Sequence, residues 1–228
     1  MRPENNILTD CAPARAEIGR ICKAGQPISL KDCNLADVDL SQLDLTDWQF
    51  ERCNFAAASF NGATLEGASF TGCRAAGASF LGASLQEGTI NGGDFSNTNF
   101  RGATLTSVKI NRCKMTGADL TEARTMGLEL EDVLLVLAVL PNLSFRKMTL
   151  KQVDFSDADL RSCDFRGAVF EDCSLRDAHL IDCAFENADL RGADLGGVRL
   201  SDARRFKGAA ISKQQAAVLL GQLGLRVL

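Results

Sequence analysis

The stretch ADLRGADL, residues 188–195, contains two copies of a five-residue unit in direct succession. A large apolar residue recurs at every fifth position from Leu30 to Leu200, and of the 35 positions in that series only Ala75 and Thr125 break it. A second series, mostly of small residues, precedes each apolar one by two positions. Neither a helix nor a strand keeps a five-residue register over this distance. The pattern therefore predicts a solenoid, in which one small unit is stacked many times and buries its apolar side against its neighbours.

Both series are free of charged residues between Ile28 and Leu200, so we assign both to the interior. Seven of the nine cysteines belong to the second series: Cys33, Cys53, Cys73, Cys113, Cys163, Cys173 and Cys183. A buried thiol packs as a slightly larger alanine, which predicts free thiols in a reducing compartment. Cys11 and Cys22 lie outside both series and receive no role. Because the cysteines form neither a CxxC motif nor a pairing with histidine, we expect no metal and no cofactor.

The unit resembles the pentapeptide repeat, A(D/N)LXX in family shorthand, and residues 118–121, 158–161 and 188–195 are near-consensus copies. This resemblance implies an all-β fold, a right-handed quadrilateral β-helix in which four pentapeptides make one square coil. Phenylalanines that recur at twenty-residue intervals, such as Phe60, Phe80 and Phe100, agree with such a coil. We expect three parts: an N-terminal helical cap (1–27), a β-helix of about nine coils (28–203) and a C-terminal helix and strand for dimerisation (204–228).

The segments outside the repeat are predicted to be helical. Residues 12–25 place apolar side chains on one side of a short helix, which would cover the open end of the solenoid or serve as an arm for a partner. Near the other end, Ser212 and Gln215 form a capping box that begins a second helix. Its apolar residues exceed what a cap needs, so we expect a two-fold homodimer, with simple capping as the alternative. The predicted dimer interface comprises Leu219, Leu220, Leu223, Leu225 and Val227.

Residues 125–145 are the one irregular stretch of the repeat. Their apolar pattern suits either a helix that ends at Pro141 or a continuous coil, and Leu130, Leu135 and Leu140 keep the five-residue phase that favours the coil. A coil would turn several apolar side chains outward, where they would form a patch for a flanking segment or a partner. That predicted patch comprises Leu134, Val136, Leu137 and Val139. Just before it, residues 125–127 are interpreted as a small kink in the rod.

Charge is unevenly distributed along the chain, whose formal net charge is −4. Residues 151–202 carry twelve carboxylates against six cations, whereas residues 26–125 carry eleven against eight. The C-terminal half is thus the acidic one, which argues against nucleic acid as a direct ligand. These outward acids either bind a basic partner or only keep the rod soluble. The candidate partner-binding acids are Asp154, Asp157, Asp159, Glu171, Asp172, Asp177, Asp182 and Asp194.

No catalytic constellation is visible in the sequence. The single histidine, His179, lies at an outward position without a nucleophile in register, and Trp48 lies at an inward position as a core residue. The glycines of the repeat occupy turns and form no phosphate-binding loop. We therefore do not expect an enzyme. The first nine residues lack the apolar core of a signal peptide, and the longest apolar run, 133–140, is too short to span a bilayer. We expect a cytoplasmic protein without a membrane partner.

Within the pentapeptide repeat superfamily, the chain is most similar to the topoisomerase-protecting proteins of the Qnr and MfpA kind. Residues 130–140 resemble a stretch in the middle of the MfpA rod, 211–225 the closing dimer module, and 126–130 a glycine joint between two stacks of coils. The chain lacks a protruding loop of the Qnr type, and its N-terminal helix is not part of that pattern. The resemblance implies a dimeric DNA mimic that binds DNA gyrase or another type II topoisomerase. Such a protein would confer quinolone resistance, a form of antibiotic resistance, or modulate supercoiling. The alternative is a protein-binding scaffold or bacterial effector module with no topoisomerase partner.

Overall fold

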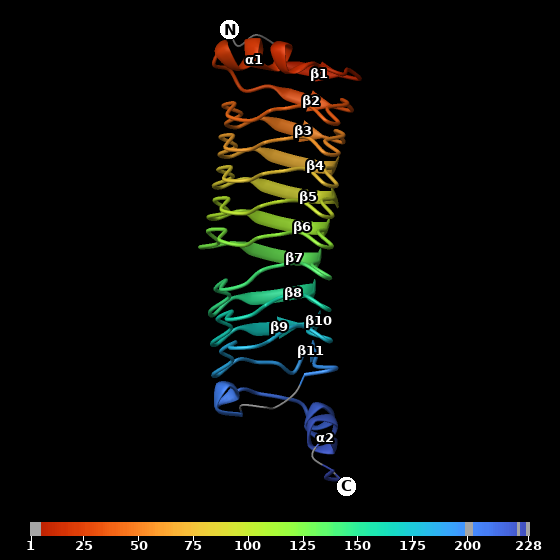
Figure 1. Cartoon of the computed structure of the whole chain (residues 1–228), viewed down its shortest axis with the longest axis vertical. Coiled ribbons are helices and arrows are strands. Elements are labelled where there is room, and N and C mark those ends of the chain that lie inside the picture. Colours follow the sequence, from red (N-terminus) through yellow and green to blue (C-terminus); the bar gives the residue numbers. More distant parts are fainter. Residues whose placement is uncertain (1–5, 199–202, 223, 227–228) are drawn as a thin grey trace.

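The computed structural model describes residues 6–198, 203–222 and 224–226 of the chain. They form one long rod of stacked coils, with the N-terminal segment at one end and the C-terminal helix at the other (Figure 1). All strand pairs are parallel and follow the order of the chain. The strands are β1 (Ile7–Thr9), β2 (Ser29–Lys31), β3 (Gln49–Glu51), β4 (Ser69–Arg74), β5 (Thr89–Asp94), β6 (Lys109–Lys114), β7 (Glu129–Leu134), β8 (Thr149–Asp154), β9 (Val169–Glu171), β10 (Cys173–Ser174) and β11 (Ala193–Asp194).

Each coil takes twenty residues, because Leu30 pairs with Phe50 and Phe50 pairs with Phe70. The fold is therefore the predicted right-handed quadrilateral β-helix, a parallel solenoid of about nine turns. We number its four faces by their apolar centres. Face 1 contains Leu30 and its equivalents twenty residues apart, face 2 contains Leu35, face 3 contains Leu40 and face 4 contains Leu45. Strands β2–β9 lie along face 1.

The corners between faces lie two residues after each apolar centre, and there the backbone takes a left-handed conformation. At Asp157 and Asp177, for example, φ is 57° and 54°. Glycine adopts this conformation freely, and Asn and Asp tolerate it better than other side chains. Gly62 and Gly82, with φ of 61° and 64°, show the glycine version of the same corner. Corner positions thus favour Asp, Asn and Gly for a local reason that is independent of any partner.

The interior is filled by the two inward series. In the five-residue series from Leu30 to Leu195, every position is buried except Thr125 and Leu180. Trp48, which belongs to the second series, is buried as predicted. On faces 3 and 4, phenylalanine rings stack directly from coil to coil, with Phe60 and Phe80 4.7 Å apart at 3°. The seven predicted packing cysteines are also buried. Such close, regular packing identifies the stacked side chains as the main source of stability.

The end segments cover both open ends of the rod. Helix α1 (Arg15–Lys23) follows β1 and buries Ile18 against the first coil, while Arg15 donates to the carbonyl oxygens of Asp39 and Ser41. At the C-terminal end, η1 (Ala203–Phe206) precedes α2 (Lys213–Gly221). Phe206 stacks on Phe185 at 4.9 Å and 4°, so the coil continues past residue 203. Its register has gained one residue, since Asp189 bridges to Ala210 rather than to residue 209.

Residues 129–148 form a regular coil and not a helix, in agreement with their five-residue phase. The ladder of hydrogen bonds between coils is nevertheless interrupted on the N-terminal side of this coil, along its faces 3 and 4. No backbone hydrogen bond joins the N–H groups of Glu122, Thr125 or Gly127 to the next coil, and the pairing of β7 with β8 starts only at Glu131 and Lys151. One coil earlier, the equivalent donors all bond to the next coil at 2.8 to 2.9 Å: Gly102, Leu105 and Ser107.

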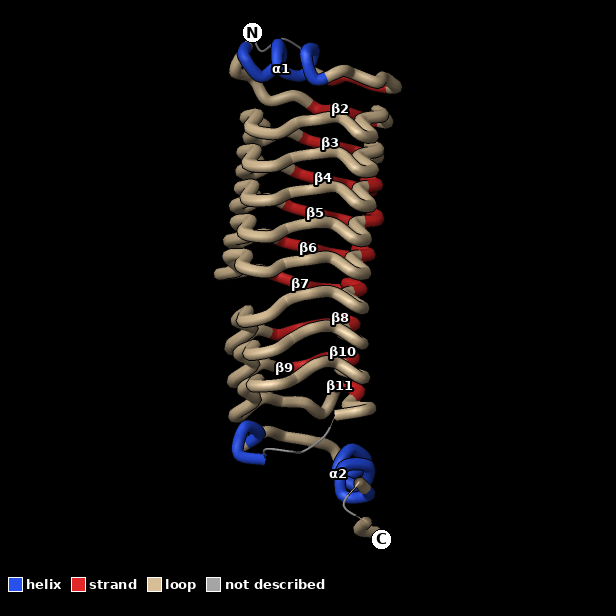
Figure 2. The backbone as a smooth tube through the Cα atoms, viewed as in Figure 1, coloured by secondary structure: helices blue, strands red, loops and turns tan. Residues whose placement is uncertain are grey.

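We call this interruption the seam; it lies between residues 122–130 and residues 141–150. Figure 2 shows that the coils of β7 and β8 are separated more widely than the other coils. Large side chains provide the physical reason. Leu143 occupies an inward position of face 4 that is Ala or Cys in most other coils, and Leu128 and Met148 occupy the same inward position of face 1 in the two coils that meet at the seam. Extra volume in a close-packed interior forces the backbone to move. The seam includes residues 125–127, where a change in the direction of the rod stays a prediction.

Amide exchange tests the seam directly. We expect the amide protons of Glu122, Thr125 and Gly127 to exchange at least about fivefold faster than those of Gly102 and Leu105. That factor corresponds to a missing hydrogen bond worth ~1 kcal/mol. NMR-detected exchange of the folded protein is the measurement. Equal protection of the two sets would show that the ladder is continuous in solution.

Candidate interaction surface

Seven of the eight predicted acids have a role in their own turn. Asp154, Asp159 and Asp194 precede an apolar centre, and the Oδ1 atom of each accepts the N–H of the residue two positions later at 2.9 to 3.2 Å. Four others are left-handed corner residues: Asp157, Asp172, Asp177 and Asp182. Only Glu171 has neither role. The acids are therefore explained in part by backbone geometry, and their charges have to be judged by what surrounds them.

Half of the predicted acids are compensated by a neighbouring cation. Asp159 pairs with Arg161 at 2.6 Å, and the hydrogen bonds from this guanidinium hold the pKa of the Asp159 carboxyl below its usual range. The other pairs are Asp182–Arg205 at 2.5 Å, Asp194–Arg176 at 2.7 Å and Glu171–Lys151 at 3.8 Å. Sequence reasoning treated all eight acids alike, although the spacing of Asp159 and Arg161 could have indicated this pair.

Four predicted acids have no cationic partner in the part of the chain that the structure describes: Asp154, Asp157, Asp172 and Asp177. We call them the uncompensated carboxylates. All four lie on face 2 or at one of its two corners, in the successive coils of β8 and β9–β10. Asp154 pairs in register with Ser174, and the N–H of Asp157 donates to the carbonyl oxygen of Arg176 at 2.9 Å. The coils are about 4.8 Å apart, so all four charges lie on one side of the rod within two neighbouring coils, and we refer to them as a cluster in that sense.

The predicted apolar patch adjoins this cluster one coil away. Leu134 pairs in register with Asp154, and Val139 bridges to Asp159. Leu134 and Leu137 are 43% and 59% exposed, whereas Val136 and Val139 are half-buried. The patch and the acids, which sequence reasoning assigned to competing functions, thus lie side by side. We call the combination the face 2 surface, although Val139 lies just past its corner on face 3: Leu134, Val136, Leu137, Val139 and the four uncompensated carboxylates.

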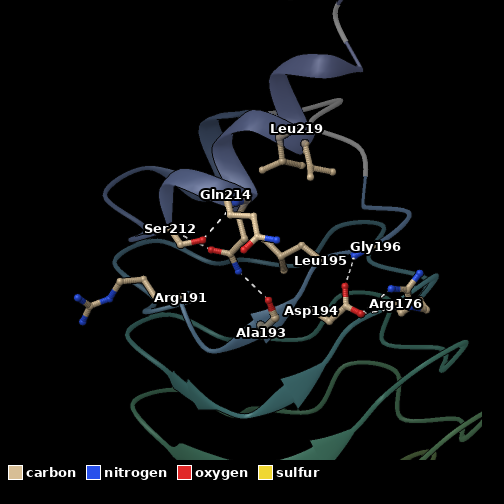
Figure 3. A pocket seen from close by; sticks show the side chains of 11 residues that line it. Arg176, Arg191, Ala193, Asp194, Leu195, Gly196, Ser212, Gln214 and Leu219 are labelled. Atoms are coloured by element: carbon tan, nitrogen blue, oxygen red, sulfur yellow. Dashed lines mark hydrogen bonds and ion pairs between the residues drawn. The ribbon is translucent and has the colours of Figure 1, made fainter. Parts of the chain in front are cut away.

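At the C-terminal end, α2 is fastened to the last coil. Ser212 and Gln215 form the predicted capping box, and Gln215 Nε2 also donates to the carbonyl oxygens of Leu190 and Ala193 at 2.7 Å each. Figure 3 shows the helix above Ala193 and Leu195, beside a cavity of about 440 Å3. Leu219, a predicted interface residue, is only 4% exposed because it packs within its own chain.

The other predicted interface residues are distributed differently. Leu220 is half-buried and Leu225 is 56% exposed, while Leu223 and Val227 lie outside the described residues. Val218, which the prediction omitted, is 57% exposed on α2. The sequence indicates that this helix is apolar, but only the docked helix shows which of its sides faces outward.

The single histidine of the chain, His179, is exposed, as predicted. Among the residues described, no three His, Cys, Asp or Glu side chains come together in a way that could hold a metal ion. Neither of the α-helices in the described ranges has the length and apolar content of a membrane span.

Comparison with known proteins points to one family. Models of pentapeptide repeats match residues 43–120 (a pentapeptide repeat region), 137–179 (nine copies) and 168–204 (eight copies). The curated proteins include no significant match to the sequence. The matches to solved structures therefore have to be judged by fold.

One similar structure is that of full-length QnrB1, described as a plasmid-mediated fluoroquinolone resistance protein. It is 18% identical with a TM-score of 0.66, and the match covers 96% of this chain and all of QnrB1. A trypsin-treated variant of QnrB1 is 22% identical with a TM-score of 0.64, over 88% of this chain and 97% of the other. HetL, a pentapeptide repeat protein involved in heterocyst differentiation regulation in the cyanobacterium Nostoc, is 19% identical with a TM-score of 0.42, over 82% and 86%.

The likeness to the two QnrB1 structures supports a repeat scaffold and, at such low identity, the fold alone. The repeat models together span residues 43–120 and 137–204, which is more than half of the chain. The twenty-residue coil, the two inward series and the left-handed corners agree with these repeat models along the rod. The chain belongs to the pentapeptide repeat family.

Proposed function

We propose that this protein binds DNA gyrase or a related type II topoisomerase through the face 2 surface, in place of duplex DNA. The observation that carries this proposal is the cluster of uncompensated carboxylates, Asp154, Asp157, Asp172 and Asp177, on a rod of regular coils. A DNA-binding saddle is basic, and clustered carboxylates at the surface attract it over roughly a Debye length, ~10 Å at 0.1 M salt. The rod has no phosphodiester bond, so the enzyme cannot cleave it.

The likeness in fold to QnrB1, described as a fluoroquinolone resistance protein, supports the same proposal. A protein that takes the place of DNA on the enzyme would also alter the effect of a drug aimed at that enzyme. The homodimer and the cytoplasmic location predicted from the sequence belong to this proposal.

The test is a supercoiling assay with purified gyrase, relaxed plasmid and increasing amounts of this protein. We expect inhibition that weakens steadily as salt is raised, because screening shortens the range of the attraction. Absence of both inhibition and binding at low salt would refute the proposal.

A second candidate function is a scaffold that binds a protein partner other than a topoisomerase. The exposure of Leu134 and Leu137 favours it, because contiguous exposed apolar side chains are unusual on a soluble monomer. Apolar contact strengthens or is unaffected when salt rises, whereas charge attraction weakens. A complex with another protein that persists at high salt, together with no effect on gyrase, would select the scaffold.

We further infer that two copies associate through their C-terminal ends, where Ile211, Val218 and Leu225 are exposed. Val218→Asp is expected to halve the mass in solution and leave the fold intact, because it places a charge in the interface without touching the chain's own core. Light scattering and circular dichroism measure the two properties. Lys213→Asp, at an exposed position at the start of the same helix, is the matched control. A wild-type protein that is already monomeric at micromolar concentration would exclude the dimer.

A further inference from the structure

The two sulfur atoms at the N-terminal end of the rod are in direct contact. Cys11 Sγ lies 2.9 Å from Cys33 Sγ, and the two residues are 22 positions apart. Elsewhere in the rod, buried thiols donate to a carbonyl oxygen of the preceding coil, as Cys53 does to Leu30 at 3.3 Å and Cys73 does to Phe50 at 3.4 Å. Cys11–Cys33 is the one sulfur–sulfur contact among the described residues that the hydrogen-bond geometry records.

The backbone holds this pair in the register of neighbouring coils. The N–H of Asn34 donates to the carbonyl oxygen of Cys11 at 2.7 Å, as the N–H of Asn54 donates to that of Cys33 at 2.9 Å. Cys11 therefore occupies, relative to Cys33, the place that Cys33 occupies relative to Cys53. Residues in register on adjacent parallel strands lie about 4.8 Å apart, which is within the Cα separation of roughly 4.4 to 6.8 Å that a disulfide requires.

Access distinguishes this pair from the other thiols. Cys11 is half-buried and lies beyond β1 at the end of the rod, whereas Cys33 is 2% exposed and Cys53 and Cys73 are 0% exposed. A small oxidant reaches Cys11 from solvent, and Cys33 is then the sulfur within reach. Cys22 is also half-buried, but no sulfur contact is recorded for it.

We propose that Cys11 and Cys33 form a reversible disulfide that locks the N-terminal cap onto the first coil when the protein meets a peroxide. The Cys11 sulfur attacks one peroxide oxygen, the O–O bond breaks and water leaves, so that Cys11 becomes a sulfenic acid. The Cys33 sulfur then attacks the Cys11 sulfur, the S–S bond forms, the S–O bond breaks and a second water leaves with the Cys33 proton. A low-molecular-weight thiol reverses the reaction by exchange.

The disulfide would make the N-terminal cap open less often and would leave the rod itself unchanged. β1 and α1 cover the open first coil through three β1–β2 pairs and the buried Ile18, with Arg15 as a polar tie. Because a solenoid is stabilised by contacts between neighbours, an end segment opens more easily than the middle. A bond that closes a loop of 22 residues should reduce such opening on the order of a hundredfold.

The environment of Cys11 makes the reaction slow at neutral pH. Burial, reinforced by Cys33, Glu17 and Cys53, raises the pKa of the Cys11 thiol to about 12. The reactive thiolate is therefore scarce at pH 7, and the rate should rise as pH increases towards that value. Slow formation suits a device that responds to sustained oxidation.

The experiment uses the full chain treated with hydrogen peroxide, quenched, unfolded and alkylated before mass spectrometry. We expect loss of two hydrogens, alkylation of seven of the nine cysteines and a cross-linked peptide pair containing Cys11 and Cys33. Amide exchange of Leu8 and Ile18 should slow on the order of a hundredfold in the oxidised protein. Cys11→Ser should abolish both changes, whereas Cys22→Ser should leave them unchanged.

Each contrary result is distinct. Nine alkylated cysteines after exposure to peroxide, or oxygen added to Cys11 without a cross-link, would overturn the proposal. A cross-link that involves Cys22 would overturn it as well. If Cys33→Ala removes the cross-link but the chain also loses its cap, the Cys11→Ser variant, altered at a half-buried position, still decides the question.

Discussion

The quadruple variant Asp154→Asn, Asp157→Asn, Asp172→Asn and Asp177→Asn is expected to fold normally and to lose nearly all inhibition of gyrase supercoiling. These four carboxylates are the ones without a cationic partner among the described residues. Coulomb attraction to a basic saddle is additive, so single substitutions should have small effects and the four together a large one. The measurement is the supercoiling assay at low salt, with circular dichroism to confirm the fold.

Asparagine is chosen because this chain already uses it in both local roles. Asn97 and Asn142 occupy left-handed corners with φ of 54° and 63°. Asn99 Oδ1 accepts the N–H of Arg101 at 3.0 Å, as Asp154 Oδ1 accepts that of Ser156 at 2.9 Å. The substitutions therefore remove charge and keep the turns, which lysine at these positions would not do.

A matched control carries four equivalent changes in the N-terminal half of the rod. It consists of Asp37→Asn, Asp44→Asn, Asp47→Asn and Glu87→Gln, all at exposed or half-buried outward positions, three of them corners. Both quadruple variants move the formal net charge from −4 to zero. If both lose inhibition equally, net charge and not the face 2 surface is responsible. If the folded face 2 variant inhibits as well as wild type, the acids serve only their turns and DNA mimicry is wrong.

Phe165→Ala is expected to lower the free energy of unfolding by ~3–5 kcal/mol, the usual cost of the cavity left by a buried phenylalanine. Phe165 is 0% exposed and lies between two parallel rings, 4.9 Å from Phe145 and 5.0 Å from Phe185. The hole would therefore interrupt a stack of four rings that runs from Phe145 to Phe206. Thermal and denaturant unfolding followed by circular dichroism give the measurement.

The neighbouring residue is the control for Phe165. Arg166 is exposed, and its ion pair with Asp164 at 2.6 Å lies at the surface, where such pairs contribute little. Arg166→Ala should cost under ~0.5 kcal/mol. Equal losses of stability in the two variants would contradict the assignment of every fifth residue to the interior.

The five-residue period by itself determined the fold and the direction of side chains along the repeat. A strict repeat has only one way to keep all its apolar centres together, so the period alone assigns Phe60, Phe165 and even Trp48 to the interior, where all three lie. The phase of Leu130, Leu135 and Leu140 likewise favoured a coil over a helix, and residues 129–148 form a coil. Local turn chemistry is also visible in the sequence, because corners favour Gly, Asn and Asp.

Only the tertiary structure decided which side chains become neighbours across coils. Contacts between residues about twenty positions apart depend on coil register and rotamers, which a one-dimensional pattern does not contain. Stacking placed Leu134 on Asp154, left Asp157 and Asp177 without cations among the described residues, and brought Cys11 to Cys33. The seam arises in the same way, since bulky Leu128, Leu143 and Met148 fit the pattern singly and disturb it only when two coils meet. Docking of α2 turned Leu219 inward and Val218 outward, because the last coil accommodates only one side of that helix.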